Sequence, residues 1–387
     1  MATRDQIIEM ACTDAGLDDF GDDAWSDALD VLLASLRDEA RLHEMGDAVA
    51  TAQVAGSLAN RLRVLDWHKH HPAAAEADVP APIVIVGQPR TGTTILHDLL
   101  AQDAGLRAPL TWEVDQPVPP PQTSTYDTDP RIAAAEEAAA LTEAVLPGFQ
   151  AIHPTGPRRA QECVTITAGD VRSLQFGTVF HIPTYTSWLL DEADMASAYR
   201  YHRQFLQLLQ SSHTGEHWLL KTPAHQWHLA DLFATYPDAT IVHTHRDPVT
   251  VLASTASLTS VLQRLGTDDP SLPELASEWA GYLAEGNRRS VLARVDGTVP
   301  TGRAIDVHFG DLMVDPFATI GAIYDQLGRE LTTDTEGAMH SFLAAHARDK
   351  HGAHTYRFAD TGLDEVEVRA ANVDYIEAFS VRPEPQS

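Results

Sequence analysis

The residues best suited to chemistry lie in one short segment, which reads Gly87-Gln88-Pro89-Arg90-Thr91-Gly92-Thr93-Thr94. Four apolar β-formers precede it and apolar residues at helical spacing follow it, so the pattern predicts a strand, a tight loop and a helix. Such a turn directs backbone N–H groups and the positive end of a helix dipole into one concavity, which suits phosphate or sulfate. The glycines have P-loop spacing, but Thr93 stands where the P-loop lysine is expected.

Other cations follow strands of the same kind. Three further strands are predicted, over residues 217–221, 240–245 and 304–309, and each is followed by Thr-Pro or Asp-Pro, which is typical of a helix start. Strands that alternate with helices favour a P-loop-type parallel sheet covered by helices, an α/β fold. Ligands bind beyond the carboxyl ends of such strands. Arg90, Lys221 and Arg246 all fall at that edge.

Arg246 has a hydroxyl partner at a suggestive spacing. If Asp247 caps the following helix, Ser254 lies about 700° around the axis and about 10 Å further along it, which is nearly the same face. The two side chains could therefore share one phosphate. Thr93 in place of the lysine, and cations rather than a magnesium-binding aspartate at the strand ends, weaken a kinase interpretation.

Composition limits the classes of partner. The chain has 387 residues with 27 Lys and Arg against 55 Asp and Glu, a formal charge of -28, so we expect no nucleic-acid partner. Two cysteines without metal spacing, no apolar signal core at the N-terminus and no run of membrane-spanning length favour a cytoplasmic protein. His243 and His245 alternate on one strand, but no acidic partner is apparent, so we expect no metal site.

Two regions would complete the protein around the anion site. Residues 1–78 form a helical N-terminal extension, which packs on the α/β domain of residues 79–387 either as a plain cap or as a lid over an acceptor pocket. A second region offers aromatic and polar side chains that either line a pocket for an organic acceptor or belong to the core. Its candidate substrate residues are Glu162, Phe176, Phe180, His181, Tyr185 and Trp188.

Taken together, these stretches resemble the sulfotransferases that use 3′-phosphoadenosine 5′-phosphosulfate (PAPS). The loop at residues 87–94 is similar to their 5′-phosphosulfate loop, and the segment from Arg246 to Ser254 has the spacing of their 3′-phosphate motif. Residues 218–225 and the closing residues 350–356 with 362–363 are similar to the bacterial branch of the family. Residues 307–312, followed by 315–316, are similar to the family's last core strand and helix. The resemblance covers roughly residues 83–363.

The resemblance implies roles for individual residues. The cofactor-binding set would be Gln88, Pro89, Arg90, Thr91, Gly92, Thr93, Thr94, Arg246, Ser254, Lys350, His351, Gly352 and Tyr356. Arg90, Glu113 and Lys221 correspond to the arginine, glutamate and lysine of tyrosylprotein sulfotransferases. The histidine base of the cytosolic enzymes is replaced by Pro223. The order of candidates for the general base is Glu113, then His225, then Glu162 and His181.

We therefore expect a sulfotransferase that moves a sulfuryl group from PAPS to a hydroxyl of a small-molecule or lipid-like acceptor and releases adenosine 3′,5′-bisphosphate (PAP). A P-loop kinase-like phosphotransferase and a non-catalytic nucleotide-binding module are the alternatives. The sequence leaves monomer and homodimer open.

Overall fold

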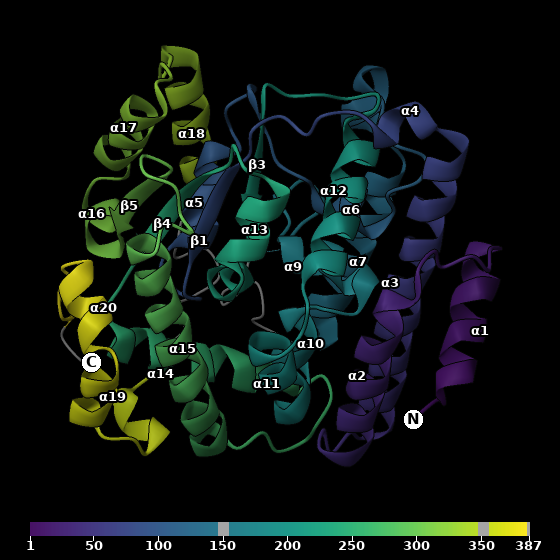
Figure 1. Ribbon diagram of the computed structural model, residues 1–387, viewed down its shortest axis with the longest axis horizontal. Coiled ribbons are helices and arrows are strands. Elements are labelled where there is room, and N and C mark those ends of the chain that lie inside the picture. Colours follow the sequence, from purple (N-terminus) through teal and green to yellow (C-terminus); the bar gives the residue numbers. More distant parts are fainter. Residues whose placement is uncertain (146–154, 347–355, 385–387) are drawn as a thin grey trace.

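A five-stranded parallel sheet organises the computed structural model, which describes residues 1–145, 155–346 and 356–384 (Figure 1). The spatial order is β2-β3-β1-β4-β5. The strands are β1 (Ile83–Gly87), β2 (Leu106–Arg107), β3 (His217–Lys221), β4 (Thr240–His245) and β5 (Ala304–His308). The predicted α/β class and four of these strands are confirmed, whereas the two-residue edge strand β2 was not predicted because it is too short to show a period.

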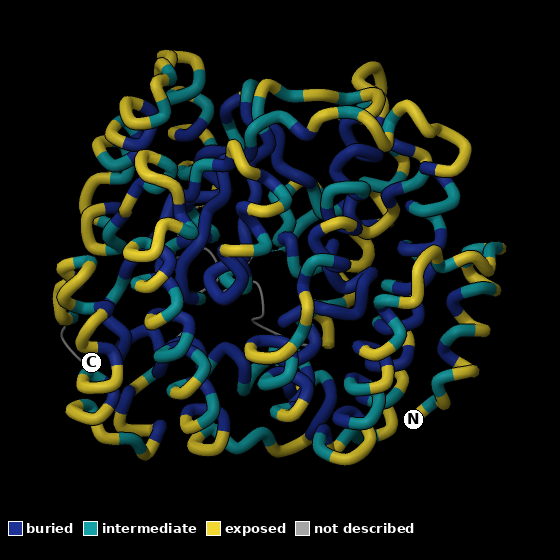
Figure 2. Tube along the Cα trace, viewed as in Figure 1, coloured by how far each residue is buried: buried dark blue, intermediate teal, exposed yellow. Residues whose placement is uncertain are grey.

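Alternate residues of the strands enter two separate apolar clusters, one on each face of the sheet. Ile83 and Ile85 pack with α5 (Thr93–Leu100) and α17 (Pro316–Leu327), while Val84 and Val86 face the larger cluster on the other side. All five residues of β1 are buried, as expected for the middle of a helix-covered parallel sheet (Figure 2). Burial on both faces fixes the register of the strand that carries the loop.

The larger cluster is covered by helices from the middle and the end of the chain. They are α6 (Thr111–Asp115), α9 (Cys163–Thr167), α10 (Leu174–Val179), α11 (Pro183–Asp191), α12 (Ala196–Gln210), α13 (Leu229–Thr235), α14 (Pro248–Gln263) and α15 (Leu272–Val295). The helix α7 (Arg131–Val145) packs against α6. The remaining helices are α16 (Phe309–Val314), α18 (Thr333–Ala345), α19 (Glu365–Ala371) and α20 (Val373–Ala378). Short 3-10 turns are η1 (Asp23–Trp25), η2 (Thr123–Thr128), η3 (Ala168–Asp170), η4 (Pro223–Trp227) and η6 (Phe358–Thr361).

The N-terminal extension is helical, as predicted, and consists of α1 (Arg4–Ala15), α2 (Ser26–Asp38), α3 (Glu44–His70) and α4 (Pro72–Ala75). It is not a separate body, because Ile7, Leu29 and Leu58 belong to the same apolar cluster as Val84 and Leu220 of the sheet. Arg61 of α3 also donates to Asp170 at 2.8 Å, and both side chains are buried. The extension therefore folds against the α/β part.

The helix starts follow the Asp-Pro prediction at two of three places. Asp247 and Asp315 each accept a hydrogen bond from the backbone of the helix that begins at the next proline. Thr222 makes no such bond, and Pro223 opens the 3-10 turn η4 instead of an α-helix. Among the described residues, no helix combines the length and the apolar character needed to cross a bilayer.

Candidate active site

The loop after β1 is held by its own side chains and by its neighbours. Gly87 has φ 138°, and a Cβ there would lie 2.3 Å from Thr244 Oγ1, so only glycine fits beside β4. The Thr91 hydroxyl lies 2.6 Å from both the Gln88 carbonyl and Thr244 Oγ1, and Gln88 donates to Leu283 O and Asn287 Oδ1. Gln88 and Thr91 therefore shape the loop from inside.

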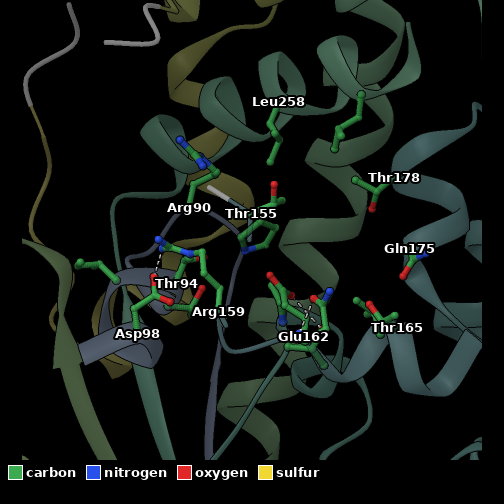
Figure 3. A pocket seen from close by; sticks show the side chains of 18 of the residues that line it. Arg90, Thr94, Asp98, Thr155, Arg159, Glu162, Thr165, Gln175, Thr178 and Leu258 are labelled. Atoms are coloured by element: carbon green, nitrogen blue, oxygen red, sulfur yellow. Dashed lines mark hydrogen bonds and ion pairs between the residues drawn. The ribbon is translucent and has the colours of Figure 1, made fainter. Parts of the chain in front are cut away.

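The outer side of this loop forms one end of a cavity of about 1460 Å³. Pro89, Arg90, Gly92, Thr93 and Thr94 line that end, at the start of α5, as predicted for the phosphate loop. The backbone N–H groups at the start of α5 and its dipole make this end suited to an anion. Figure 3 shows the opposite wall, with Thr165, Gln175 and Thr178.

Glu162 lies between these two walls in the same view (Figure 3). Its carboxylate contacts Lys221, the cation of the neighbouring strand. The ammonium of Lys221, at the end of β3, forms a short ion pair with Glu162 and donates to Thr94 Oγ1 at 3.3 Å. Lys221 is almost fully buried, but Thr94, Glu162 and Thr222 around it line the cavity. A carboxylate and an ammonium are thus paired beside the phosphate loop.

Arg246, at the end of β4, forms an ion pair with the carboxylate of Glu384. Its Nε and NH2 donate to Glu384 at 2.8 and 2.9 Å, its NH1 donates to the Arg90 carbonyl at 2.7 Å, and its guanidinium stacks on Phe309. Arg90 in turn donates from Nε to Ser254 Oγ at 3.0 Å. Arg246 and Ser254, which were predicted to share one phosphate, therefore both form a hydrogen bond with Arg90.

The electrostatics of this corner favour an anion. Burial lowers the pKa of Arg90, and the neighbouring charge of Arg246 lowers it further. Two guanidinium groups this close to each other are stabilised by any negative group between them. Tyr356, predicted as a cofactor residue, also lines the cavity here, whereas the predicted Lys350, His351 and Gly352 lie outside the described residues.

Glu113, the first candidate for the general base, is not brought to the cavity. Its side chain is fully buried and accepts hydrogen bonds from Arg107 NH2 at 2.7 Å, the Leu110 backbone at 2.8 Å and the Tyr126 hydroxyl at 3.0 Å. These contacts use both carboxylate oxygens to hold α6 in place. This geometry favours a structural role for Glu113 at the start of α6 over the predicted catalytic one.

His225 is also placed elsewhere. Its Nδ1 lies 2.7 Å from the Tyr199 hydroxyl, and burial lowers its pKa well below the ordinary value. His181 contacts Glu278 at 2.9 Å and Arg41 at 3.2 Å, and it does not line the described cavity either. Neither histidine is positioned as the base of a reaction in the cavity.

The aromatic residues predicted for the acceptor pocket belong to the core. Phe176, Phe180 and Tyr185 are at most 1% exposed, and the Tyr185 hydroxyl donates to Val171 O at 2.6 Å. The partly buried Trp188 packs against the same cluster. The helix α10 does reach the cavity, but with its opposite face, because Leu174, Gln175, Thr178 and Val179 line it.

The far end of the cavity is largely apolar and draws on four further elements. Its lining there includes Val49, Val164, Leu174, Val179, Leu258, Leu262, Leu265 and Trp279. Val49 and Gln53 come from α3, so the N-terminal extension contributes to the pocket wall, as the lid alternative predicted. A cavity this large exceeds the usual range for one small ligand and has room for two.

A parallel sheet with a glycine-rich anion loop, followed by cations at the ends of two neighbouring strands, defines an α/β protein of the P-loop type. Residues 82–334 match the model of the Sulfotransferase family, and the chain belongs to that family.

The solved relatives have the same fold throughout. Sulfotransferase STF9 from Mycobacterium avium superposes with a TM-score of 0.89 at 28% identity, over 99% of this chain and 98% of that one. Sulfotransferase STF1 from Mycobacterium tuberculosis H37Rv gives 0.84 at 29% identity, over 96% and 98% of the two chains. The omega-hydroxy-beta-dihydromenaquinone-9 sulfotransferase Stf3 of Mycobacterium bovis is 25% identical over 260 residues, which are 64% of this chain and 62% of that relative.

Several cavity residues were not predicted from the sequence. Arg159 pairs with Asp98 of α5 beside the phosphate loop, as the dashed line in Figure 3 shows. Burial raises the pKa of Asp98, and the Arg159 charge opposes that shift. Glu384 was missed because it lies 138 residues from Arg246. Gln175 and Thr178 are three residues apart, so the sequence alone could have predicted that they lie on one face of a helix.

Proposed function

We propose that this protein transfers a sulfuryl group from PAPS to a hydroxyl of a lipid-like acceptor. The observation that carries the proposal is one cavity that is lined both by the anion-binding loop and by apolar side chains of several helices, with Glu162, the partner of Lys221, between the two walls (Figure 3). The kinase alternative is less well supported because cations, not a metal-binding aspartate, follow the strands.

The chain's own residues fit the proposed donor at both phosphate positions. Arg246 binds the planar carboxylate of Glu384 through two parallel hydrogen bonds, which is the geometry with which arginine also binds phosphate. Ser254 and Arg90 lie beside it. The N-terminus of α5, with Thr93 and Thr94, would hold the 5′-phosphate.

The bound donor supplies the sulfuryl group and a phosphate leaving group. Lys221 and Arg90 would stabilise the negative charge that grows on the leaving oxygen, since Lys221 is held by Glu162 and Thr94 and Arg90 is held by Ser254. Glu162 would accept the proton of the acceptor hydroxyl, because it is the carboxylate that lies between the two walls of the cavity and it contacts Lys221. Glu162 thus replaces Glu113 as the proposed base.

The acceptor chamber supports a lipid-like molecule. Its walls combine aliphatic side chains and Trp279 with polar side chains, among them Gln53, Thr165, Gln175 and Thr178. Such a chamber favours an acceptor that buries an extended apolar body and presents one hydroxyl towards Glu162. The name of the relative Stf3 describes an acceptor of that kind.

Two measurements test the proposal. Calorimetry with PAP in the absence of magnesium should show binding, while ATP should bind far more weakly with or without magnesium. Incubation with sulfur-labelled PAPS and a bacterial lipid extract should then label an organic-soluble product. Magnesium-dependent ATP binding without PAP binding would support the kinase alternative, and PAP binding without transfer to any extract would support a non-catalytic module.

A further inference from the structure

A second cluster of reactive side chains lies on the sheet away from the cavity. In the register of β4 with β5, His243 pairs with Asp306 and His245 pairs with His308, so four such residues occupy adjacent positions on one sheet face. One ligand atom each of His243, His245 and Asp306 lie within 4.8 Å of one another. The neighbouring strand thus supplies an acidic partner, Asp306, that the local sequence pattern did not reveal.

Within this cluster, the ring of His243 is unusual because it is buried without a hydrogen-bond partner. It is 1% exposed, and neither of its ring nitrogens has a hydrogen-bond partner among the described residues. A buried polar group without a partner costs about 1–3 kcal/mol, so such a ring calls for an explanation.

The neighbouring groups already orient the other two side chains. His245 Nε2 lies 2.9 Å from Asp306 Oδ1, and His245 Nδ1 lies 3.2 Å from the Tyr375 hydroxyl. A hydrogen bond from the nitrogen that does not bind the metal, as at Nδ1 here, commonly orients a histidine ligand. Asp306 is 41% exposed, which leaves a path from solvent. The opposing feature is Arg294, whose NH2 lies 2.5 Å from Asp306 Oδ1 and competes for the carboxylate.

We propose that His243, His245 and Asp306 form a binding site for a divalent transition-metal ion of the zinc type. Two imidazoles and one carboxylate are a common zinc ligand set, and ligand atoms around zinc lie about 3.4 Å apart, which small side-chain shifts would reach here. None of the three residues lines the described cavity, and they join the neighbouring strands β4 and β5, so we expect the ion to act on stability and not on transfer.

The test uses the purified full chain with zinc or cobalt alone. Wild type should take up one equivalent of cobalt with the visible absorption bands of a tetrahedral site, and zinc should raise its Tm. His243→Gln and Asp306→Asn should both lose the bands and the Tm shift, while His340→Gln, at an exposed histidine of α18, should keep them. Absence of cobalt bands in wild type, or bands unchanged in both site variants, would overturn the proposal.

Arg294 provides a variant that does not depend on loss of folding. Arg294→Met removes the competitor of the metal for Asp306, so we expect cobalt to bind about tenfold more tightly than in wild type. Equal or weaker binding in this variant would contradict the assignment of Asp306 as a ligand.

A different observation, the ion pair of Glu384 with Arg246, carries a second inference, which rests on the proposed function. The segment after α20 is fixed at three points: Arg382 pairs with Asp311 at 2.6 Å, the Glu384 backbone donates to Asp247 at 2.7 Å, and its carboxylate holds Arg246. We propose that Glu384 is an intramolecular competitor for the 3′-phosphate of the nucleotide, which helps the product leave.

The test compares PAP and AMP binding by calorimetry. Glu384→Gln should bind PAP about three- to tenfold more tightly, since the ion pair is only partly exposed, while AMP, which has no 3′-phosphate, should bind equally well. Glu377→Gln makes the same charge change at an exposed position of α20 and should behave as wild type. PAP binding that is present but unchanged in Glu384→Gln would overturn this inference alone, whereas no PAP binding by wild type would overturn the proposed function.

Discussion

Replacement of Glu162 and Glu113 by glutamine, one at a time, tests which of the two carboxylates is the general base, the role that we propose for Glu162. Glu162→Gln keeps the size of the side chain but removes the proton acceptor beside Lys221. Loss of a positioned general base typically lowers turnover by about 10² to 10⁴. Because Glu162 does not contact Arg246 or Ser254 in the described contacts, PAP affinity should change little.

Glu113→Gln should show the opposite pattern. Glu113 is fully buried, and its partner Arg107 is 4% exposed, so the substitution leaves a buried guanidinium without its counter-charge. Breaking such a pair costs about 3–5 kcal/mol in the free energy of unfolding. The protein that remains folded should retain near-normal turnover, since no contact of Glu113 reaches the cavity.

The assay for both variants has two parts. Turnover is measured as label transfer from PAPS to the lipid extract at saturating donor, and stability is measured by urea unfolding at the same pH. A Glu162→Gln enzyme with near-normal turnover would refute the assignment of the base. A Glu113→Gln enzyme with normal stability and strongly reduced turnover would restore the role that the sequence resemblance implied for Glu113.

Three further predictions concern the cofactor, the acceptor and pH. Arg246→Ala should weaken PAP binding by about 2–5 kcal/mol, the loss expected for a buried charged hydrogen bond, and unchanged affinity in calorimetry would sink the 3′-phosphate assignment. Thr178→Trp should narrow the acceptor chamber and lower transfer by about 10²-fold while PAP affinity stays the same; reduced PAP affinity would instead mean that the chamber belongs to the donor. Burial lowers the pKa of His97, His202 and His228 to about 3, so the unfolded chain binds more protons than the folded one below about pH 6.5, and urea titrations should show stability falling as the pH drops from there towards 3. His202→Phe should reduce the slope of the free energy of unfolding against pH by up to about 1.4 kcal/mol per pH unit. An unchanged slope would contradict the lowered pKa of His202.

The phosphate end of the site was largely predictable because local sequence determines it. A strand that ends in glycine, and helices that begin with Asp-Pro, place Arg90, Lys221 and Arg246 at one edge of the sheet without further information. The capping contact of Glu113 with the Leu110 backbone, three residues earlier, was also a local signal. Read in that way, Glu113 would have been assigned to the start of α6.

The acceptor end was not predictable from local pattern. An irregular run of aromatics does not reveal which face of α10 points to the core, and the packing of α10 against α14 decides this. Contacts such as Glu384 with Arg246, or His245 with Asp306, join residues that are 138 and 61 positions apart. No spacing rule links residues at such separations, because only the completed sheet brings them together.

The contribution of α3 to the cavity wall has a consequence for the divergence of such enzymes. Val49 and Gln53 touch the acceptor chamber, while the phosphate loop lies entirely in the later part of the chain. Under the function that we propose, substitutions in the first 78 residues should change acceptor preference and leave donor recognition unchanged. Whole-segment exchange between relatives is harder, since Arg61 and Leu58 tie α3 to the rest of the core, so point changes on the cavity side of α3 are the accessible route to new acceptors.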